Sequence, residues 1–92
     1  MTMAADRFTV AEDVLAAHLA GEAVLLDLRD KNYYRLNETA AAVWKEIERG
    51  VSREDLISAV LKAFEIGRNE AVAEVDALLS DLLHRNLIVH VK

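Results

Sequence analysis

The stretch "NYYRLNETAAAVW", residues 32–44, decides the fold because its hydrophobic period changes in the middle. Up to Leu36 the side chains alternate, so Tyr34 and Leu36 share one face of a strand. Asn37 is a good N-cap, because its side-chain oxygen can accept a hydrogen bond from a backbone amide that has no partner within the helix. After it, apolar side chains recur at helical spacing: Ala40, Val43, Trp44 and Ile47. We therefore expect a strand that leads directly into a helix ending at Gly50.

Two further strands are expected upstream, "VLAAHL" (14–19) and "EAVLLDL" (22–28). Short polar or glycine-containing turns separate the three strands, so an antiparallel meander is the simplest arrangement. The alternation then assigns faces to the strands. In the second strand one face carries Val24, Leu26 and Leu28 and the other carries Leu25 and Asp27. We expect the more apolar set to be buried, and we expect Tyr34 to face the core while Tyr33 and Arg35 face away.

Two more helices follow, with a short break at each glycine. Ser52 and Asp55 resemble a capping box at the start of the second helix, with Asp in place of the usual Glu, and Gly67 is expected to end it. Asn69 is expected to cap a third helix, "EAVAEVDALLSDLLHRN". The apolar positions of the two helices are Leu56, Ile57, Val60, Leu61 and Phe64, then Ala71, Val72, Val75, Leu78, Leu79, Leu82 and Leu83. The tail "LIVHVK" can return as a short strand or wing.

Size and composition limit the kind of protein. With 92 residues, of which 53% are apolar and 29% charged, the chain is expected to form a single domain, 1–92, with its core over about 14–89. The order of elements predicts an α+β domain of winged helix-turn-helix-like layout, a three-stranded antiparallel sheet followed by three helices. The absence of cysteine excludes disulfides and Cys-based metal sites. We see no signal peptide or membrane span, so we expect a cytoplasmic location.

Motifs for catalysis are missing from the sequence. His18, His84 and His90 do not have the spacing of a metal site, and neither Ser52 nor Ser80 lies in a GxSxG motif. No glycine-rich phosphate-binding loop occurs, so we expect no nucleotide or other cofactor and no metal. The sequence therefore predicts a binding protein and not an enzyme.

Two surfaces could serve for binding. A helix-turn-helix layout is compatible with DNA binding, but the third helix carries more acidic than basic residues and the whole chain has a net charge of −5. The basic footprint of a DNA-binding protein is therefore missing. The second surface is the edge strand "NYYRL", whose unpaired backbone groups could accept a strand from a peptide beside the third helix. The alternative is that Tyr33 and Tyr34 are ordinary packing residues.

The stretch "VLLDLRDKNYYRLNETAAAVWKEIERGVSREDLISAVLKAFEI" resembles the PqqD-like family, the stand-alone recognition elements of ribosomally synthesised and post-translationally modified peptides (RiPPs). The resemblance rests on the order and spacing of "LLDL", "YYRLN", "TAAAVW", the break at Gly50 and the "SREDL" that begins at Ser52. It covers about residues 14–89. The resemblance implies a small non-catalytic protein that binds the leader segment of a precursor peptide and presents it to processing enzymes.

In that family the leader adds as a strand beside the third strand and packs against the third helix. The resemblance places the contact strand at Asn32, Tyr33, Tyr34, Arg35 and Leu36, and helical periodicity selects Val72, Val75, Asp76, Leu79 and Leu83 as the facing residues. "NYYRLNETAAAVW" is most similar to the proteins of lasso-peptide clusters, which implies a transglutaminase-like leader peptidase and a cyclase as further partners. The alternatives are a pyrroloquinoline quinone-type peptide chaperone and a winged helix-turn-helix DNA-binding regulator.

Overall fold

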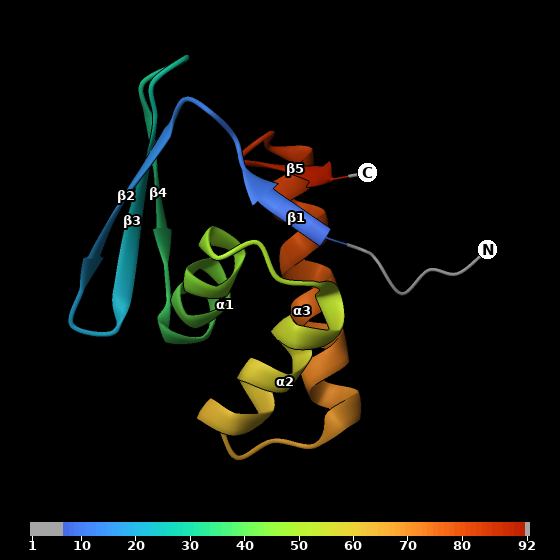
Figure 1. Cartoon of the computed structure of the whole chain (residues 1–92). Helices are drawn as coiled ribbons and strands as arrows, with labels where there is room; N and C mark the ends of the chain where they lie inside the picture. The colour runs from blue at the N-terminus through green and yellow to red at the C-terminus, as the bar shows by residue number, and fades with distance from the viewer. Residues whose placement is uncertain (1–6, 92) are drawn as a thin grey trace.

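The computed structural model describes residues 7–91, in which a three-stranded sheet lies on one side of helix α1 and a small two-stranded sheet lies beside the last helix (Figure 1). The helices are α1 (Glu38–Glu48), α2 (Arg53–Ala63) and α3 (Arg68–His84). The strands are β1 (Arg7–Val10), β2 (Val14–Leu19), β3 (Glu22–Asp27), β4 (Asn32–Leu36) and β5 (Ile88–Val91). The predicted α+β order, a three-stranded antiparallel sheet followed by three helices, is confirmed.

The three-stranded sheet has the order β2-β3-β4, and both strand pairs are antiparallel, as predicted. The turn between β2 and β3 consists of Ala20 and Gly21, which both have positive φ, 46° and 86°. Two successive residues with positive φ form the type I′ turn that suits a two-residue hairpin. A Cβ at Gly21 would also lie 3.3 Å from the Glu38 carboxylate, so both backbone conformation and space favour glycine.

The buried face of β3 differs from the prediction. The buried residues are Ala23, Leu25 and Asp27, whereas Val24 and Leu26 are half-buried and Leu28 is 42% exposed. The cause is the register: Leu25 lies opposite Tyr34, so β3 turns the same face inward as β4. The facing of β4 follows from chain continuity, because only Asn37 separates Leu36 from α1, and Leu36 is buried in the core. The expectation that the more apolar set of β3 is buried was therefore wrong.

The starts of α1 and α2 agree with the predicted caps. The Asn37 side-chain oxygen accepts a hydrogen bond from the Ala40 amide at 2.9 Å. Ser52 and Asp55 form the reciprocal hydrogen bonds of a capping box, in which each side chain accepts from the backbone amide of the other residue. Both caps satisfy amides that have no partner within the helix, and so define where each helix begins.

The end of α2 and the start of α3 lie elsewhere than predicted. α2 ends at Ala63, and Phe64 already has an extended backbone, which lets Phe64 and Ile66 both pack against the core. α3 begins at Arg68 with Gly67 as its N-cap, and the Gly67 carbonyl accepts the Ala71 amide at 2.9 Å. Asn69 therefore lies in the first turn of α3, and its predicted capping role was wrong.

β1 and β5 form a second antiparallel sheet that joins the two ends of the described chain. The tail returns as a strand, as expected, but its partner β1 was not predicted. Phe8 is buried in β1, and its ring stacks on the ring of His90 with the centroids 4.9 Å apart. A four-residue strand is too short to show a clear period, and its partner lies at the far end of the chain, so local sequence carries little sign of it.

Helix α1 lies at the centre of the fold, where it contacts β3, β4, β1 and α2 (Figure 1). Its Trp44 is fully buried, and the indole Nε1 donates a hydrogen bond to Glu48 Oε2 at 2.9 Å, so the buried ring has its polar atom satisfied. Within residues 7–91, no helix has the length and apolar character needed to cross a membrane.

Candidate functional site: a groove between strand β4 and helix α3

Strand β4 is an edge strand, because β3 pairs with one side of it and no strand of residues 7–91 pairs with the other. Some of the N–H and C=O groups of Asn32–Leu36 are therefore left for a further strand. The pairing with β3 is continuous, so the strand has no bulge, and its one charged side chain is Arg35. The edge can accept an extended chain.

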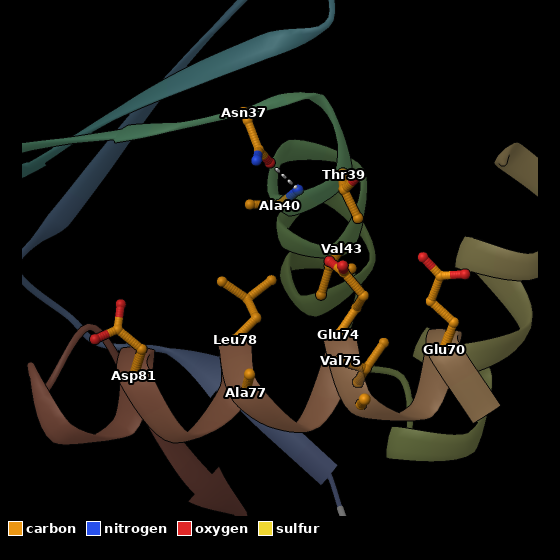
Figure 2. A pocket seen from close by; sticks show the side chains of 11 residues that line it. Asn37, Thr39, Ala40, Val43, Glu70, Glu74, Val75, Ala77, Leu78 and Asp81 are labelled. Atoms are coloured by element: carbon orange, nitrogen blue, oxygen red, sulfur yellow. Dashed lines mark hydrogen bonds between the residues drawn. The ribbon is translucent and has the colours of Figure 1, made fainter. Parts of the chain in front are cut away.

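A groove runs beside this edge and consists of two hollows that share Leu78 and Asp81. The smaller hollow, of about 270 Å³, lies between β4 and the C-terminal half of α3. The larger, of about 420 Å³, lies between the start of α1 and α3 (Figure 2). Asn37 joins β4 to α1 without a loop, so the hollows follow one another along the chain. We call this surface, lined by β4, the start of α1 and α3, the β4–α3 groove.

The other edge strand of this sheet, β2, has no groove along its length. Hollows of about 550–580 Å³ lie around the β2–β3 turn and along α1 and α2, and none of them borders β4. Within residues 7–91, no group of three or more His, Cys, Asp or Glu side chains is placed to hold a metal ion. The β4–α3 groove is therefore distinguished by following four consecutive residues of an edge strand, whereas the hollow at the β2–β3 turn meets edge strand β2 only at His18.

Apolar side chains form the floor of the larger hollow. Val43 and Val75 are fully buried there, and Leu78 projects toward α1 from α3 (Figure 2). The short side chains of Ala40 and Ala77 fill little of the remaining space. Such a floor can take an apolar side chain of a bound chain, since complete burial of a Val- or Leu-sized side chain contributes about 1.5–3 kcal/mol.

The two ends of the groove differ in charge. At the β4 end, Arg85 Nε donates to Asp81 Oδ1 at 3.1 Å, and the guanidinium carbon lies 5.3 Å from the centre of the Tyr34 ring. The hydrogen bond to Asp81 raises the pKa of Arg85 above its ordinary value, so this group stays charged. At the α1 end, Glu70 and Glu74 border the larger hollow (Figure 2). A bound chain therefore meets the Arg85–Asp81 ion pair at one end and two carboxylates at the other.

An ion pair between a buried carboxylate and an exposed arginine joins the sheet to the C-terminal end of α3. Asp27 is buried, and Arg29 donates to both of its carboxylate oxygens at 2.9 Å. Arg29 Nη2 also donates to the Asn86 carbonyl at 2.6 Å, in the turn after α3. The hydrogen bond from the Arg29 side chain is the main reason that the pKa of Asp27 lies below its ordinary value, against the opposing effect of burial. The pair therefore connects the end of β3 to the segment that closes the groove.

The predicted strand residues lie together along the groove. Tyr33, Tyr34, Arg35 and Leu36 line the smaller hollow, and Asn32 begins the same edge. Tyr34 is half-buried and Leu36 is buried, whereas Tyr33 is 70% exposed, in agreement with the expected facing of the two rings.

The predicted helix residues lie on different sides of α3. Val75 lines the larger hollow. Asp76 faces α2, where its two carboxylate oxygens accept hydrogen bonds from Arg53 at 2.8 Å, and this lowers the pKa of Asp76. Leu79 is buried in the core. Val72 and Leu83 are half-buried against the core and border neither hollow.

Helix α3 presents a different stripe to the groove: Glu70, Ala73, Glu74, Val75, Ala77, Leu78, Asp81, Leu82 and Arg85. Much of this stripe is displaced by about one residue from the predicted set, which is about 100° around a helix. Helical periodicity selected a mainly apolar set, whose apolar members lie in the core or pack against it, while Asp76 pairs with Arg53 of α2. The available signal was the mixed series Leu78, Asp81 and Arg85, in which charged residues lie on the same side as a leucine and so exclude it from the core.

The fold and the groove together define the class of protein. It is a small α+β domain in which an edge strand lies open beside a helix. The model of the family described as coenzyme PQQ synthesis protein D (PqqD) matches residues 22–88, and the chain belongs to this family. The resemblance to the PqqD-like family is therefore confirmed. No curated protein matches the chain in sequence.

Two solved structures are similar to this chain over most of their length. TbiB1 in complex with the TbiA(beta) leader peptide has a TM-score of 0.82 and 24% identity, covering 87% of this chain and 93% of that one. A lasso peptide synthetase B1 complexed with the leader peptide has a TM-score of 0.79 and 27% identity, covering 89% of this chain and 96% of that one. These two proteins share the fold described above.

Proposed function

We propose that this chain is a RiPP recognition element, which binds the leader segment of a precursor peptide by adding it as a strand to β4. The observation that carries this proposal is the open edge of β4 beside the β4–α3 groove, which offers one extended peptide both backbone hydrogen bonds and side-chain hollows. In this proposal the chain catalyses no reaction itself and works in the cytoplasm, where precursor peptides are synthesised.

The strand geometry determines how the peptide would lie. Side chains of an added strand alternate, so every second one points toward α3 and the others point away with Tyr33 and Arg35. The inward side chains meet Tyr34 at one end of the groove and Leu78 farther along. Backbone bonds to Asn32–Leu36 supply affinity that depends little on sequence, and the hollows supply selectivity.

The comparisons support a place in lasso-peptide maturation. Both similar structures are described as complexes with leader peptides, and one of these proteins is a lasso peptide synthetase B1. We therefore propose that the bound precursor passes to a transglutaminase-like leader peptidase and to a cyclase. The family description favours a second candidate, a peptide chaperone in coenzyme PQQ synthesis. Binding of the quinone precursor peptide in preference to a lasso leader would support this second candidate.

A titration tests leader binding. The probe is a fluorescein-labelled leader segment of a lasso-peptide precursor, with a scrambled peptide as the control. Leu78→Glu should raise the dissociation constant roughly 10- to 100-fold, because it puts a charge where about 1.5–3 kcal/mol of apolar burial is expected. Leu61→Glu, a matched change of a half-buried leucine on α2, should leave the affinity unchanged. Absence of saturable binding to the wild-type protein would refute the proposal.

Amide hydrogen exchange tests strand addition itself. The leader should slow exchange in Asn32–Leu36, whose outward amides gain partners, and should leave the other sheet edge, Val14–Leu19, unchanged. Protection that appears at β2 and not at β4 would exclude β4 as the receiving strand.

A further inference from the structure

The two walls of the smaller hollow are joined at one end by a side chain that lies outside the hollow. Strand β4 begins at Asn32, directly after the turn 28–31, and α3 ends at His84, two residues before Asn86. Arg29 belongs to that turn, and its Nη2 donates to the Asn86 carbonyl at 2.6 Å. Arg29 itself lines neither hollow of the β4–α3 groove. It therefore connects the start of one wall to the end of the other.

A buried carboxylate fixes the direction of the Arg29 side chain. Asp27 Oδ1 accepts hydrogen bonds from Arg29 Nε at 2.9 Å and from the Arg29 backbone amide at 3.0 Å, and Oδ2 accepts from Nη2 at 2.9 Å. The Asp27 side chain is 4% exposed, whereas that of Arg29 is 43% exposed. Two parallel bonds to a carboxylate define the plane and the orientation of a guanidinium. Nη2 is thereby held in the position from which it reaches Asn86.

Asn86 lies where a movement of the chain changes the shape of the smaller hollow. Its neighbours on either side, Arg85 and Leu87, both line that hollow. Asn86 has a φ of 60°, in the left-handed region that commonly ends a helix, and its amide donates to the Leu83 carbonyl at 3.0 Å. The carbonyl that Arg29 holds therefore lies between two residues of the wall.

The contact that Arg85 makes across the smaller hollow is weaker than this link. Its guanidinium carbon lies 5.3 Å from the centre of the Tyr34 ring, and the Arg85 side chain is exposed. A cation–π contact at an exposed site contributes little, because water competes for the cation. The link through Arg29 depends instead on a carboxylate that is buried. It therefore contributes more than the Tyr34 contact to the separation between β4 and the end of α3.

This separation matters for an added strand. A strand beside β4 lies about 4.8 Å from it, and its inward side chains must fill the space that remains before α3. If the end of α3 moves away, these side chains lose their contacts with Arg85 and Leu87, although the backbone bonds to β4 can still form. A residue that sets the separation therefore affects leader affinity without contacting the leader.

Resting on the proposed function, we infer that Arg29 is a positioning residue for leader binding. Together with Asp27 it holds the turn at Asn86 against the start of β4, and so keeps the smaller hollow at the width that the leader requires. Without Arg29 the end of α3 moves away from β4, and the arrangement that binds the leader becomes a minor fraction of the free protein.

The test compares leader affinity in Arg29→Gln and Arg53→Gln. Arg53→Gln is the matched control, since Arg53 donates to both carboxylate oxygens of Asp76 at 2.8 Å and forms an ion pair of the same geometry on the α2 side of α3. Arg29→Gln should raise the dissociation constant of the labelled leader about tenfold, as expected when the binding arrangement falls to about a tenth of the population. Arg53→Gln should leave this constant at the wild-type value. Urea unfolding gives the folded fraction of each variant, for which the titrations are corrected.

A nuclear magnetic resonance measurement separates positioning from a general loss of stability. The Tyr34 ring shields the Arg85 side-chain protons that lie over it. In Arg29→Gln the Arg85 Hδ resonances should move toward their random-coil positions, because the end of α3 has moved away from β4. In Arg53→Gln they should stay where they are in the wild type.

Arg29→Gln leaves the buried Asp27 carboxylate without its ion-pair partner, so a second variant keeps the test decisive if this one does not fold, as judged by circular dichroism. Asp27→Asn combined with Arg29→Gln removes the buried charge as well. It should also weaken leader binding about tenfold.

Wild-type affinity in the folded variants would overturn the inference while leaving leader binding intact. An equal loss of affinity in Arg53→Gln, or a loss in Arg29→Gln with unchanged Arg85 resonances, would overturn it too. A wild-type protein that does not bind the leader would refute the proposed function and this inference together.

Discussion

Replacing Leu25 or Leu26 by Ala tests which face of the three-stranded sheet is closed. Leu25 is fully buried on the side of α1, whereas its neighbour Leu26 is half-buried on the opposite side of the sheet. The two changes remove the same atoms from adjacent positions of the central strand. A difference in stability between the variants therefore reports burial and not the strand propensity of Ala.

The expected magnitudes follow from burial. Truncating a fully buried leucine costs about 2.7–5 kcal/mol, which combines lost transfer free energy with the cavity that remains. The Leu26 side chain borders water, so its truncation leaves no enclosed cavity and should cost about 1 kcal/mol. For a domain of this size, 1 kcal/mol lowers the melting temperature by about 4–8 °C. Leu25→Ala should therefore melt at least about 7 °C below Leu26→Ala.

Urea unfolding followed by far-ultraviolet circular dichroism measures both variants, with thermal melts as a second readout. Both should remain folded at 25 °C, since domains of this kind have about 5–15 kcal/mol of stability. Equal losses, or a larger loss for Leu26→Ala, would refute the assigned facing.

Two further predictions concern the ion pair and a helix cap. Arg29 holds the pKa of Asp27 below its ordinary value of 3.8, so Asp27 stabilises the folded state above that pH and this contribution is lost as the pH falls through the folded-state pKa. Arg29→Gln should therefore flatten the acid side of a plot of unfolding free energy against pH, and an unchanged profile would contradict this role. Asn37→Ala should lower the free energy of unfolding by about 1 kcal/mol. Asn37→Ser should retain most of the stability, and equal losses for both changes would show that the cap contributes little.

Local sequence was sufficient for features that depend on neighbouring residues. The three strands of the meander lie within one residue of the predicted ranges, because turn residues and alternation act over a few positions. The caps at Asn37 and Ser52 were also predictable, since a capping side chain bonds to an amide within its own first turn. The edge position of β4 followed from the order of the strands.

Three features required the tertiary structure. The apolar set of β3 faces outward because pairing with β4 fixes its facing, and side-chain composition does not override that register. Strand β1 forms because β5 returns from the other end of the chain to pair with it.

The helix wall of the groove is the third such feature. Helix α3 is apolar over a wide angle, and packing against α2 and β5 determines which part of it is buried. The remaining stripe, with Leu78, Asp81 and Arg85, is left to line the groove. The sequence by itself therefore determined the three helices, the three strands of the meander and the open strand of this protein. The tertiary structure decided which faces meet, because facing depends on contacts between segments that are distant in the chain.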